Sequence, residues 1–199
     1  MSLRDALPEA SVLESASKCE IQDVKGNKVD FGSIFAEQKT VVVFIRHFFC
    51  GEYVGQLAAV PQAALESAGT RIVVIGCGEW QPIENYADIT EFQGAIYTDP
   101  SRKLYNTLGM DIQNLAKTPS GQKKPSYITM GAFTNIWQSL RTGPFKIPSL
   151  IGKQGNMAQL GGDFVLGPGN TCSFAHRMQH TEDHIEVVDL MKAAGVTMA

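Results

Sequence analysis

Short runs of apolar, mostly β-branched residues recur along the chain and predict the strands of a sheet. Thr40–Ile45 has only apolar residues after its threonine, as expected of a parallel strand buried on both faces. Arg71–Gly76 and Gly162–Leu166 have similar runs, and Ala95–Thr98 is a shorter one. Thr171–Ala175 follows the Gly-Pro-Gly-Asn turn after Leu166, so it is expected to return antiparallel to the preceding strand.

At the start of the chain, the pattern predicts a short β-hairpin within Cys19–Val29, with its turn at Lys25-Gly26-Asn27. Asp30 then follows as the expected N-cap of a short helix that reaches Phe35. The hairpin therefore precedes the central strand.

Helical spacing of apolar residues separates the predicted strands. Glu52–Ser67 carries such a stripe, but Pro61 lies inside it and should kink or restart the helix. The other predicted helices are Ile83–Phe92, Ser101–Leu108 with Gly109 as its C-cap, Ile128–Leu140 and Asp183–Ala194.

This order of elements predicts an α/β fold with a central mixed β-sheet flanked by helices. The βαβ units imply parallel strands with helices on both faces, and the terminal hairpin adds antiparallel pairing. Residues 110–160 interrupt the alternation and are interpreted as an insertion, because they are too poor in strands to form a core of their own. We therefore expect one domain over residues 1–199. Ligand chemistry in such sheets lies beyond the carboxyl ends of the strands, where Cys50 and Cys77 fall.

Composition and charge narrow the choice of partners and compartment. The net charge of −3 predicts neither nucleic-acid nor membrane binding, and no apolar run approaches the length of a membrane span. The four cysteines, Cys19, Cys50, Cys77 and Cys172, form no CxxC pair. Together with a start that lacks a secretory pattern, this favours a reducing, cytoplasmic setting.

Cys50 is the strongest candidate for chemistry. It lies between the predicted central strand and the next helix, where the helix N-terminus and Arg46 would stabilise a thiolate. His47 could serve as a general base. The alternatives remain open: Cys50 could be inert, Arg46 could pair with Glu52, and His47 could be a structural hydrogen-bonding partner.

Two further patterns are weaker. His176, His180 and His184 recur every four residues, which on one helix could bind Zn²⁺, but Phe174–Arg177 has the pattern of a strand end. The glycines around Cys77 and Pro168 lack the context of phosphate-binding loops. We therefore predict no metal and no cofactor.

Ordered motifs along nearly the whole chain resemble the peroxiredoxin-like 2 group of the AhpC/TSA proteins, which have a thioredoxin-like fold. The matching segments are Val41-Val42-Val43-Phe44-Ile45-Arg46-His47-Phe48-Phe49-Cys50, Glu52-Tyr53, Val73-Val74-Ile75-Gly76, Tyr97-Thr98-Asp99-Pro100, Leu104-Tyr105, Leu108-Gly109-Met110, Ile136-Trp137-Gln138-Ser139-Leu140, Thr142-Gly143-Pro144, Gly161-Gly162, Leu166-Gly167-Pro168-Gly169-Asn170, Phe174-Ala175-His176-Arg177 and Asp183-His184.

The sequence departs from this resemblance around Cys50. Peroxiredoxins carry P-x-x-x-T-x-x-C, whereas Val43 and His47 occupy the proline and threonine positions here. The group usually reads R-H-F-x-C-x-x-C-x-E-Y, so this chain is three residues shorter and lacks the second cysteine. If the deletion is real, Cys50 has no second cysteine with which to carry out dithiol exchange. If three further residues that include a cysteine follow Cys50, a dithiol mechanism becomes the favoured one.

The resemblance implies a thiol-dependent oxidoreductase with Cys50 as nucleophile and Arg46 and His47 as its helpers. Cys77 and Cys172 are the candidate resolving cysteines, and a thioredoxin- or glutathione-type thiol is the expected reductant. One alternative is an enzyme for a hydrophobic small molecule, with a pocket formed by Phe49, Tyr53, Trp137 and Phe145. Another is a redox-inactive interaction module. Peroxidases of this kind often dimerise, so a homodimer is one expected state.

Overall fold

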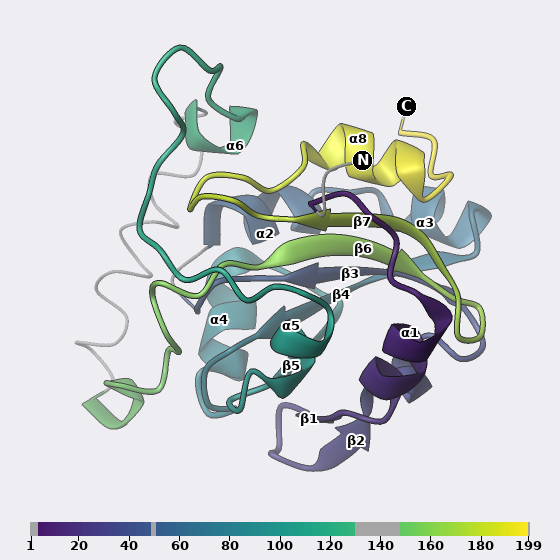
Figure 1. Ribbon diagram of the computed structural model, residues 1–199, viewed down its shortest axis with the longest axis horizontal. Coiled ribbons are helices and arrows are strands. Elements are labelled where there is room, and N and C mark those ends of the chain that lie inside the picture. Colours follow the sequence, from purple (N-terminus) through teal and green to yellow (C-terminus); the bar gives the residue numbers. More distant parts are fainter. Residues whose placement is uncertain (1–3, 49–50, 130–147, 199) are drawn as a thin grey trace.

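All strands of the computed structural model, which describes residues 4–48, 51–129 and 148–198, belong to one sheet. The sheet has seven strands in the order β2-β1-β5-β4-β3-β6-β7 (Figure 1). The strands are β1 (Glu20–Gln22), β2 (Lys28–Asp30), β3 (Lys39–Phe44), β4 (Thr70–Gly76), β5 (Ala95–Thr98), β6 (Gly162–Leu166) and β7 (Cys172–Arg177).

The centre of the sheet is parallel and its margins are antiparallel. β3 pairs with β4, and β4 with β5, in parallel register. β6 runs antiparallel to β3, β7 to β6, and β1 to both β2 and β5. The predicted mixed sheet and the N-terminal hairpin are therefore confirmed. β3 lies inside the sheet between β4 and β6, and its residues from Thr40 onward are buried, as expected of a strand covered on both faces.

Helices cover both faces of the sheet. One apolar cluster packs residues of α2, α3, α4 and α8 against the sheet, and a second packs α1, η1 and α5 against the other face. The helices are α1 (Ala10–Ser17), α2 (Gly51–Ala58), α3 (Gln62–Ser67), α4 (Ile83–Thr90), α5 (Lys103–Thr107), α6 (Ser126–Thr129) and α8 (Val187–Ala193), with the 3₁₀ helices η1 (Phe31–Ile34) and η3 (Pro148–Leu150).

Several helix boundaries differ from the expectations. The helix expected over Glu52–Ser67 is interrupted, because α2 ends at Ala58 and α3 restarts after Pro61, one of the two outcomes predicted for that proline. Asp30 precedes η1 but its side chain makes no capping hydrogen bond, so that expectation was wrong. The last helix begins at Val187 rather than at Asp183, whose carboxylate accepts a hydrogen bond from the backbone of Gln179 instead.

One helix was not predicted, and one predicted helix is described only in part. Helix α1 was not predicted, and it buries Leu13 and Ala16. The helix expected over Ile128–Leu140 coincides with the described residues only at its start, where α6 ends at Thr129; the remainder lies outside the described residues.

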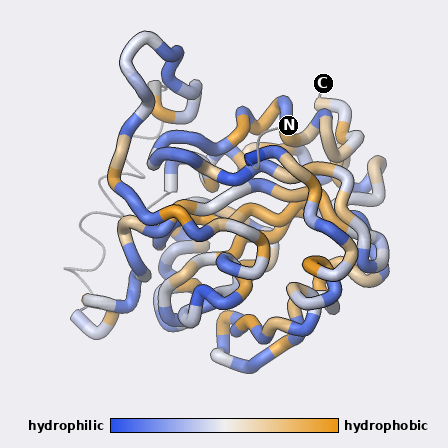
Figure 2. The backbone as a smooth tube through the Cα atoms, in the orientation of Figure 1, coloured by the Kyte–Doolittle hydropathy of each residue, from blue (hydrophilic) through white to orange (hydrophobic). Residues whose placement is uncertain are grey.

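The colouring by hydropathy in Figure 2 places the apolar residues in the central strands and the polar ones in the outer loops. In the described part of the chain, the helices are too short and too polar to cross a membrane.

Candidate functional site

The candidate site lies where β3 and β4 end, beside the start of α2. After β3 the chain continues through Ile45, Arg46, His47 and Phe48, and α2 begins at Gly51. Phe49 and Cys50, the predicted nucleophile, lie outside the described residues. The site is therefore described from the residues on either side of Cys50.

Tyr105 of α5 joins the ends of the two central strands. Its hydroxyl is 2.7 Å from the carbonyl oxygen of Ile45 and 2.8 Å from that of Ile75, and the tyrosine is fully buried. The Ile45 amide also donates to the Ile75 carbonyl, at 2.9 Å. Because one buried phenol lies within hydrogen-bonding distance of both carbonyl oxygens, it fixes the position of the backbone at Ile45, where the chain turns toward Cys50.

Cys77, the first residue after β4, lies against the other side of this corner. Its Sγ donates a hydrogen bond to the carbonyl oxygen of Arg46, 2.9 Å away, and the residue is 4% exposed. A Cβ atom on Gly155 would come within 2.9 Å of the same sulfur, so the loop after η3 packs closely over the thiol. The structure thus brings Cys77 and Arg46 together.

The two polar residues predicted beside Cys50 have different environments. Arg46 is partly exposed, and its guanidinium donates to the carbonyl oxygen of Met157 over 3.4 Å. His47 is 3% exposed, so it belongs to the interior of the corner. Phe48 is buried as well, and its amide donates to the carbonyl of Gln154 at 3.0 Å.

Cys172, the second candidate resolving cysteine, lies at the other end of the sheet. It pairs with Leu166, which in turn pairs with Thr40 near the start of β3, whereas Cys50 follows the end of that strand. Burial raises the pKa of the Cys172 thiol to about 11, against smaller lowerings by a backbone hydrogen bond of Phe174 and by the charge of Arg177. Its position and its protonation are both unfavourable for resolving an intermediate on Cys50.

The four residues predicted to line a hydrophobic pocket are mostly undescribed. Phe49, Trp137 and Phe145 lie outside the described residues. Tyr53 is described and is 2% exposed, in the core between α2 and the sheet.

A buried polar group next to Tyr53 was missed by the sequence analysis. Asp163 of β6 is fully buried and accepts a hydrogen bond from His184 Nδ1 at 2.9 Å. The imidazole of His184 stacks on the Tyr53 ring, with 4.3 Å between centroids and 6° between planes. One signal was available in the sequence: Asp163 lies two residues before Val165, and therefore on the same face of a strand that is otherwise apolar.

The other histidines of the regular spacing do not share a helix with His184. His176 lies on β7 and His184 precedes α8, as the strand pattern of Phe174–Arg177 indicated. His176 Nε2 is hydrogen-bonded to the Asp183 carbonyl oxygen at 2.7 Å, and its Nδ1 is hydrogen-bonded to the Asp5 carboxylate at 2.9 Å. In the part of the chain that the structure describes, no group of three His, Cys, Asp or Glu side chains could hold a metal ion.

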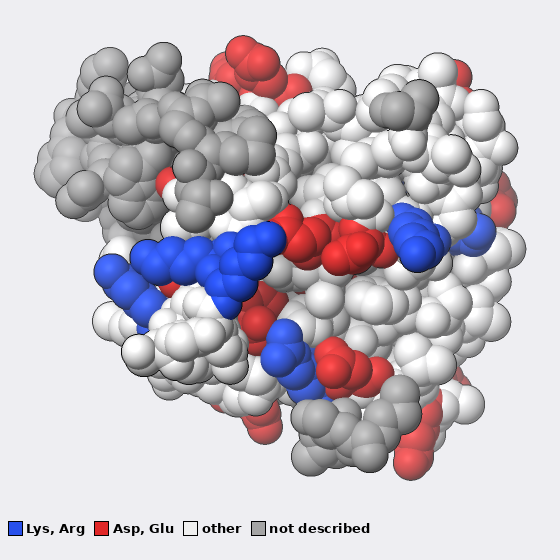
Figure 3. All heavy atoms as spheres, turned by 90° about the horizontal axis from the view of Figure 1, so that it is seen from above, with Lys and Arg blue, Asp and Glu red and all other residues white. Residues whose placement is uncertain are grey.

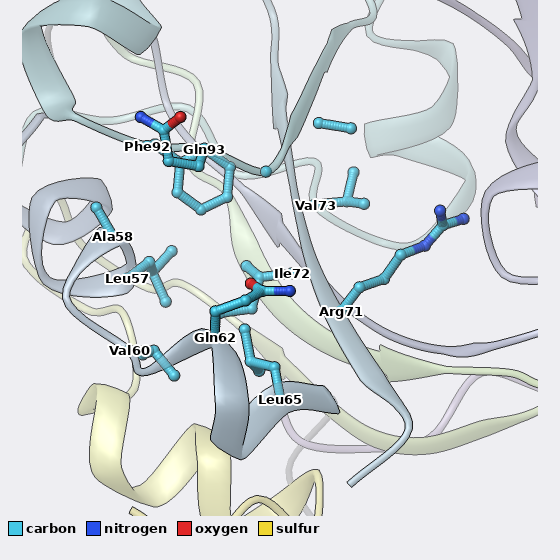
Figure 4. A pocket seen from close by; sticks show the side chains of 12 residues that line it. Leu57, Ala58, Val60, Gln62, Leu65, Arg71, Ile72, Val73, Phe92 and Gln93 are labelled. Carbon is cyan, nitrogen blue, oxygen red and sulfur yellow. The ribbon is translucent and has the colours of Figure 1, made fainter. Parts of the chain in front are cut away.

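One surface pocket lies far from this corner. It has a volume of about 210 Å³ and opens between the α2–α3 turn and the first residues of β4 and β5, next to Gln62 and Phe92 (Figure 4). Because Cys77 follows the opposite end of β4, this pocket is not part of the candidate site.

On the face shown in Figure 3, acidic and basic side chains lie next to one another across the described surface.

The fold is shared with solved peroxiredoxins. Peroxiredoxin Q of Xanthomonas campestris superposes with a TM-score of 0.57 at 13% identity, over 96% of this chain and 92% of the other. A peroxidoxin, BcpB of Mycobacterium tuberculosis, gives a TM-score of 0.53 at 11% identity, over 89% of each chain. These likenesses confirm the predicted thioredoxin-like fold.

Sequence relatives identify the family. Human peroxiredoxin-like 2C is 34% identical over 186 residues, which cover 92% of this chain and 80% of that protein. A protein named prostamide/prostaglandin F synthase, from Pongo abelii, is 26% identical over 87% of this chain and 84% of its own length. The profile of the AhpC/TSA antioxidant enzymes matches residues 56–180. The chain therefore belongs to the AhpC/TSA family, within its peroxiredoxin-like 2 group.

Proposed function

We propose that the protein is a thiol-dependent oxidoreductase of peroxiredoxin-like type, with Cys50 as its nucleophile. The family and the thioredoxin-like fold support a redox function in general. The observation that favours Cys50 is that α2 begins at Gly51, directly after it, at the end of the buried central strand. The partial positive charge of a helix N-terminus favours a thiolate at such a position.

In the proposed reaction, the Cys50 thiolate attacks one oxygen of a hydroperoxide and the O–O bond breaks. The sulfur becomes a sulfenic acid, and the other oxygen leaves as an alkoxide that takes up a proton to form the alcohol. Arg46 lowers the energy of the thiolate and of the developing negative charge, and His47 is the candidate proton donor. These roles rest on the places of Arg46 and His47 next to Cys50 in the chain.

Completion of the cycle requires a second thiol. Condensation of the sulfenic acid with a thiol releases water and forms a disulfide, which a thioredoxin- or glutathione-type reductant then reduces. Cys77 is the favoured internal candidate, because its Sγ already contacts the Arg46 carbonyl oxygen at the same corner. Such a reductant implies a reducing compartment, so we propose the cytoplasm as the location.

The test compares Cys50→Ser with Cys19→Ser in a peroxide-consumption assay. Cys19 is a buried cysteine on the other face of the sheet, so its replacement is a matched control. We expect Cys50→Ser to abolish consumption of hydrogen peroxide and trapping of a sulfenic acid by dimedone, while Cys19→Ser retains both. Activity that survives in Cys50→Ser would refute the proposal.

A second candidate function is reduction of a hydrophobic small molecule by the same thiol. It is favoured by the relative named prostamide/prostaglandin F synthase, which matches most of both chains. We expect this activity, if it is the main one, to give a lower KM for an organic endoperoxide than for hydrogen peroxide. Equal or higher KM for the endoperoxide would exclude it.

The third hypothesis, a redox-inactive interaction module, makes the opposite prediction for the thiol. A module of that kind would leave Cys50 unreactive toward iodoacetamide in the folded protein. Rapid alkylation of Cys50, located by peptide mass spectrometry, would therefore favour the oxidoreductase. Chromatography with light scattering on the same sample measures whether the protein is the proposed homodimer.

A further inference from the structure

One edge of strand β5 is largely open. β4 pairs with each of its residues, but on the opposite side β1 pairs with it at a single position, where Gln22 lies opposite Thr98 (Figure 1). After Gln22 the chain turns away from β5, because the Asp23 amide donates to the carbonyl oxygen of Asn27 in the hairpin turn. Along Ala95–Tyr97, the described part of the chain therefore supplies no partner strand on that side.

The direction of the backbone groups shows which of them face the open side. The Asp99 amide, just after β5, donates to the Gly76 carbonyl of β4. Because backbone groups alternate in direction along a strand, those of Thr98 and Ile96 point away from β4. Thr98 is matched by β1, whereas the N–H and C=O of Ile96 have no strand opposite them among the described residues. An edge of this kind is a template on which an added strand can pair.

A groove of about 520 Å³ lies along this edge, and we call it the β5 groove. It is lined by β5, by Val24 after the end of β1, and by Ile83 and Ala87 of α4. The described residues next to Cys50 do not line it. An extended chain beside Ile96 would therefore lie between the hairpin and α4, in contact with apolar side chains from both.

The charged residues of the β5 groove are all acidic. Asp23, Glu84 and Asp88 line it, and no lysine or arginine does so among the described residues. Glu84 and Asp88 are exposed and lie one turn apart on α4, and neither forms a salt bridge with another described residue. Like charges at this spacing slightly destabilise a helix, so a cation bound beside them would relieve their repulsion. The groove therefore favours a basic ligand.

The arrangement of these residues also selects the kind of side chain that fits. Ile96 belongs to the same apolar cluster as Ile83, so α4 covers the face of the sheet toward which the Ile96 side chain points. Alternate side chains of an added strand would point to that face. A lysine or arginine there can place its apolar stem against Ile83 and its cation beside Glu84 or Asp88.

We propose that the β5 groove binds an extended basic segment of a partner protein, which adds a strand at the open edge of β5. Backbone hydrogen bonds to Ile96 hold the segment, and lysine or arginine side chains at alternate positions pair with the carboxylates of α4. A second copy of this chain is a poorer occupant, because its own β5 groove would bring Asp23, Glu84 and Asp88 against the same three acids. The proposal is independent of the chemistry at Cys50.

The test measures binding of the peptide fluorescein-Lys-Val-Lys-Val-Lys-Val-amide to the full chain by fluorescence anisotropy. We expect saturable binding that weakens as the salt concentration rises, and no binding of the same peptide with glutamate in place of lysine. Loss of two ion pairs predicts about tenfold weaker binding to the double variant Glu84→Gln with Asp88→Asn. Glu66→Gln with Asp189→Asn is the matched control, because these exposed acids lie on α3 and α8, outside the groove. It should bind as the parent does.

Two measurements separate strand addition from attraction between charges alone. Amide hydrogen exchange at Ile96 should slow when the lysine peptide is added, while exchange at Tyr97, whose amide faces β4, should not change. Of two peptides, N-methylated either at every valine or at every lysine, one should lose binding, since only one set of amides faces β5.

Three results would overturn the proposal. The first is failure of the lysine peptide to bind, or equal binding to the Glu84→Gln, Asp88→Asn variant and the parent. The second is equal binding of the two N-methylated peptides, or unchanged exchange at Ile96, which would leave only attraction between charges. The third is protection of Ile96 that grows with protein concentration in the absence of peptide, which would assign the open edge to a second copy of this chain.

Discussion

Cys77 and Arg46 are joined by a hydrogen bond of 2.9 Å from the thiol of one to the backbone carbonyl oxygen of the other. The residues follow β4 and β3, two neighbouring parallel strands, and the bond fixes their ends relative to each other. The same contact holds the favoured resolving thiol beside the segment that leads to Cys50.

Removal of this donor is expected to destabilise the fold. Cys77→Ala leaves the Arg46 carbonyl without the thiol, and the free energy of unfolding should fall by about 1–3 kcal/mol. Cys77→Ser keeps a hydroxyl donor and should lose less. Urea denaturation of both variants measures the difference, and an alanine variant as stable as the serine variant would contradict this account.

Tyr105 gives a second prediction about the same corner. Tyr105→Phe retains the ring and deprives the Ile45 and Ile75 carbonyls of their phenol, so the free energy of unfolding should fall by about 1–2 kcal/mol. Tyr97→Phe is the control, because its hydroxyl makes no hydrogen bond among the described residues. Thermal or urea unfolding measures the change. Equal effects of the two substitutions would show that the bridge contributes nothing.

The pKa of Cys172 predicts its alkylation as a function of pH. Only the thiolate reacts, and raising the pKa from 9.0 to about 11 leaves roughly a hundredfold less thiolate at pH 8. The rate of iodoacetamide labelling should therefore rise about tenfold for each pH unit up to pH 10, without reaching a plateau. Peptide mass spectrometry follows Cys172 separately from the other cysteines. A plateau near pH 9 would show that burial does not raise this pKa.

Much of the fold could be predicted because its strongest signals are local. The apolar run of β3 and the alternation of strands and helices identify the parallel centre of the sheet, and Pro61 marks the break between α2 and α3. Helix α1 was missed because its buried side is small, consisting of Leu13 and Ala16, and no side chain caps its start. Local pattern is weak where a helix depends on packing for its stability.

The candidate site was predictable only in part, for a different reason. The prediction placed Cys50 and Cys77 at strand ends, where topology brings the chain together. The hydrogen bond between Asp163 and His184 joins residues far apart in sequence, and nothing in local periodicity links them. Likewise, Tyr53 has the spacing of an ordinary core residue, and only the structure reveals its stack with an imidazole.

The shortened segment at Cys50 leads to the last prediction. The chain lacks three residues and one cysteine relative to the group's usual C-x-x-C, at the junction just before α2. Insertion of Pro-Tyr-Cys after Cys50 lengthens that junction and leaves the residues of β3 and of α2 from Gly51 onward unchanged. We expect this insertion to give the protein a dithiol that exchanges with disulfides.

In a C-x-x-C pair the second thiol attacks the mixed disulfide on the first and releases the reduced substrate, so turnover does not wait for an external thiol. The variant should therefore reduce the disulfides of insulin, with dithiothreitol as electron donor, faster than the parent protein. Insertion of Pro-Tyr-Ser is the matched control, because it restores the length without the second thiol. If the serine insertion accelerated the reaction equally, the length of the junction, rather than the missing cysteine, would limit thiol–disulfide exchange at Cys50. If neither insertion did so, the corner would be unable to support that exchange, and Cys50 would have to act as a single thiol.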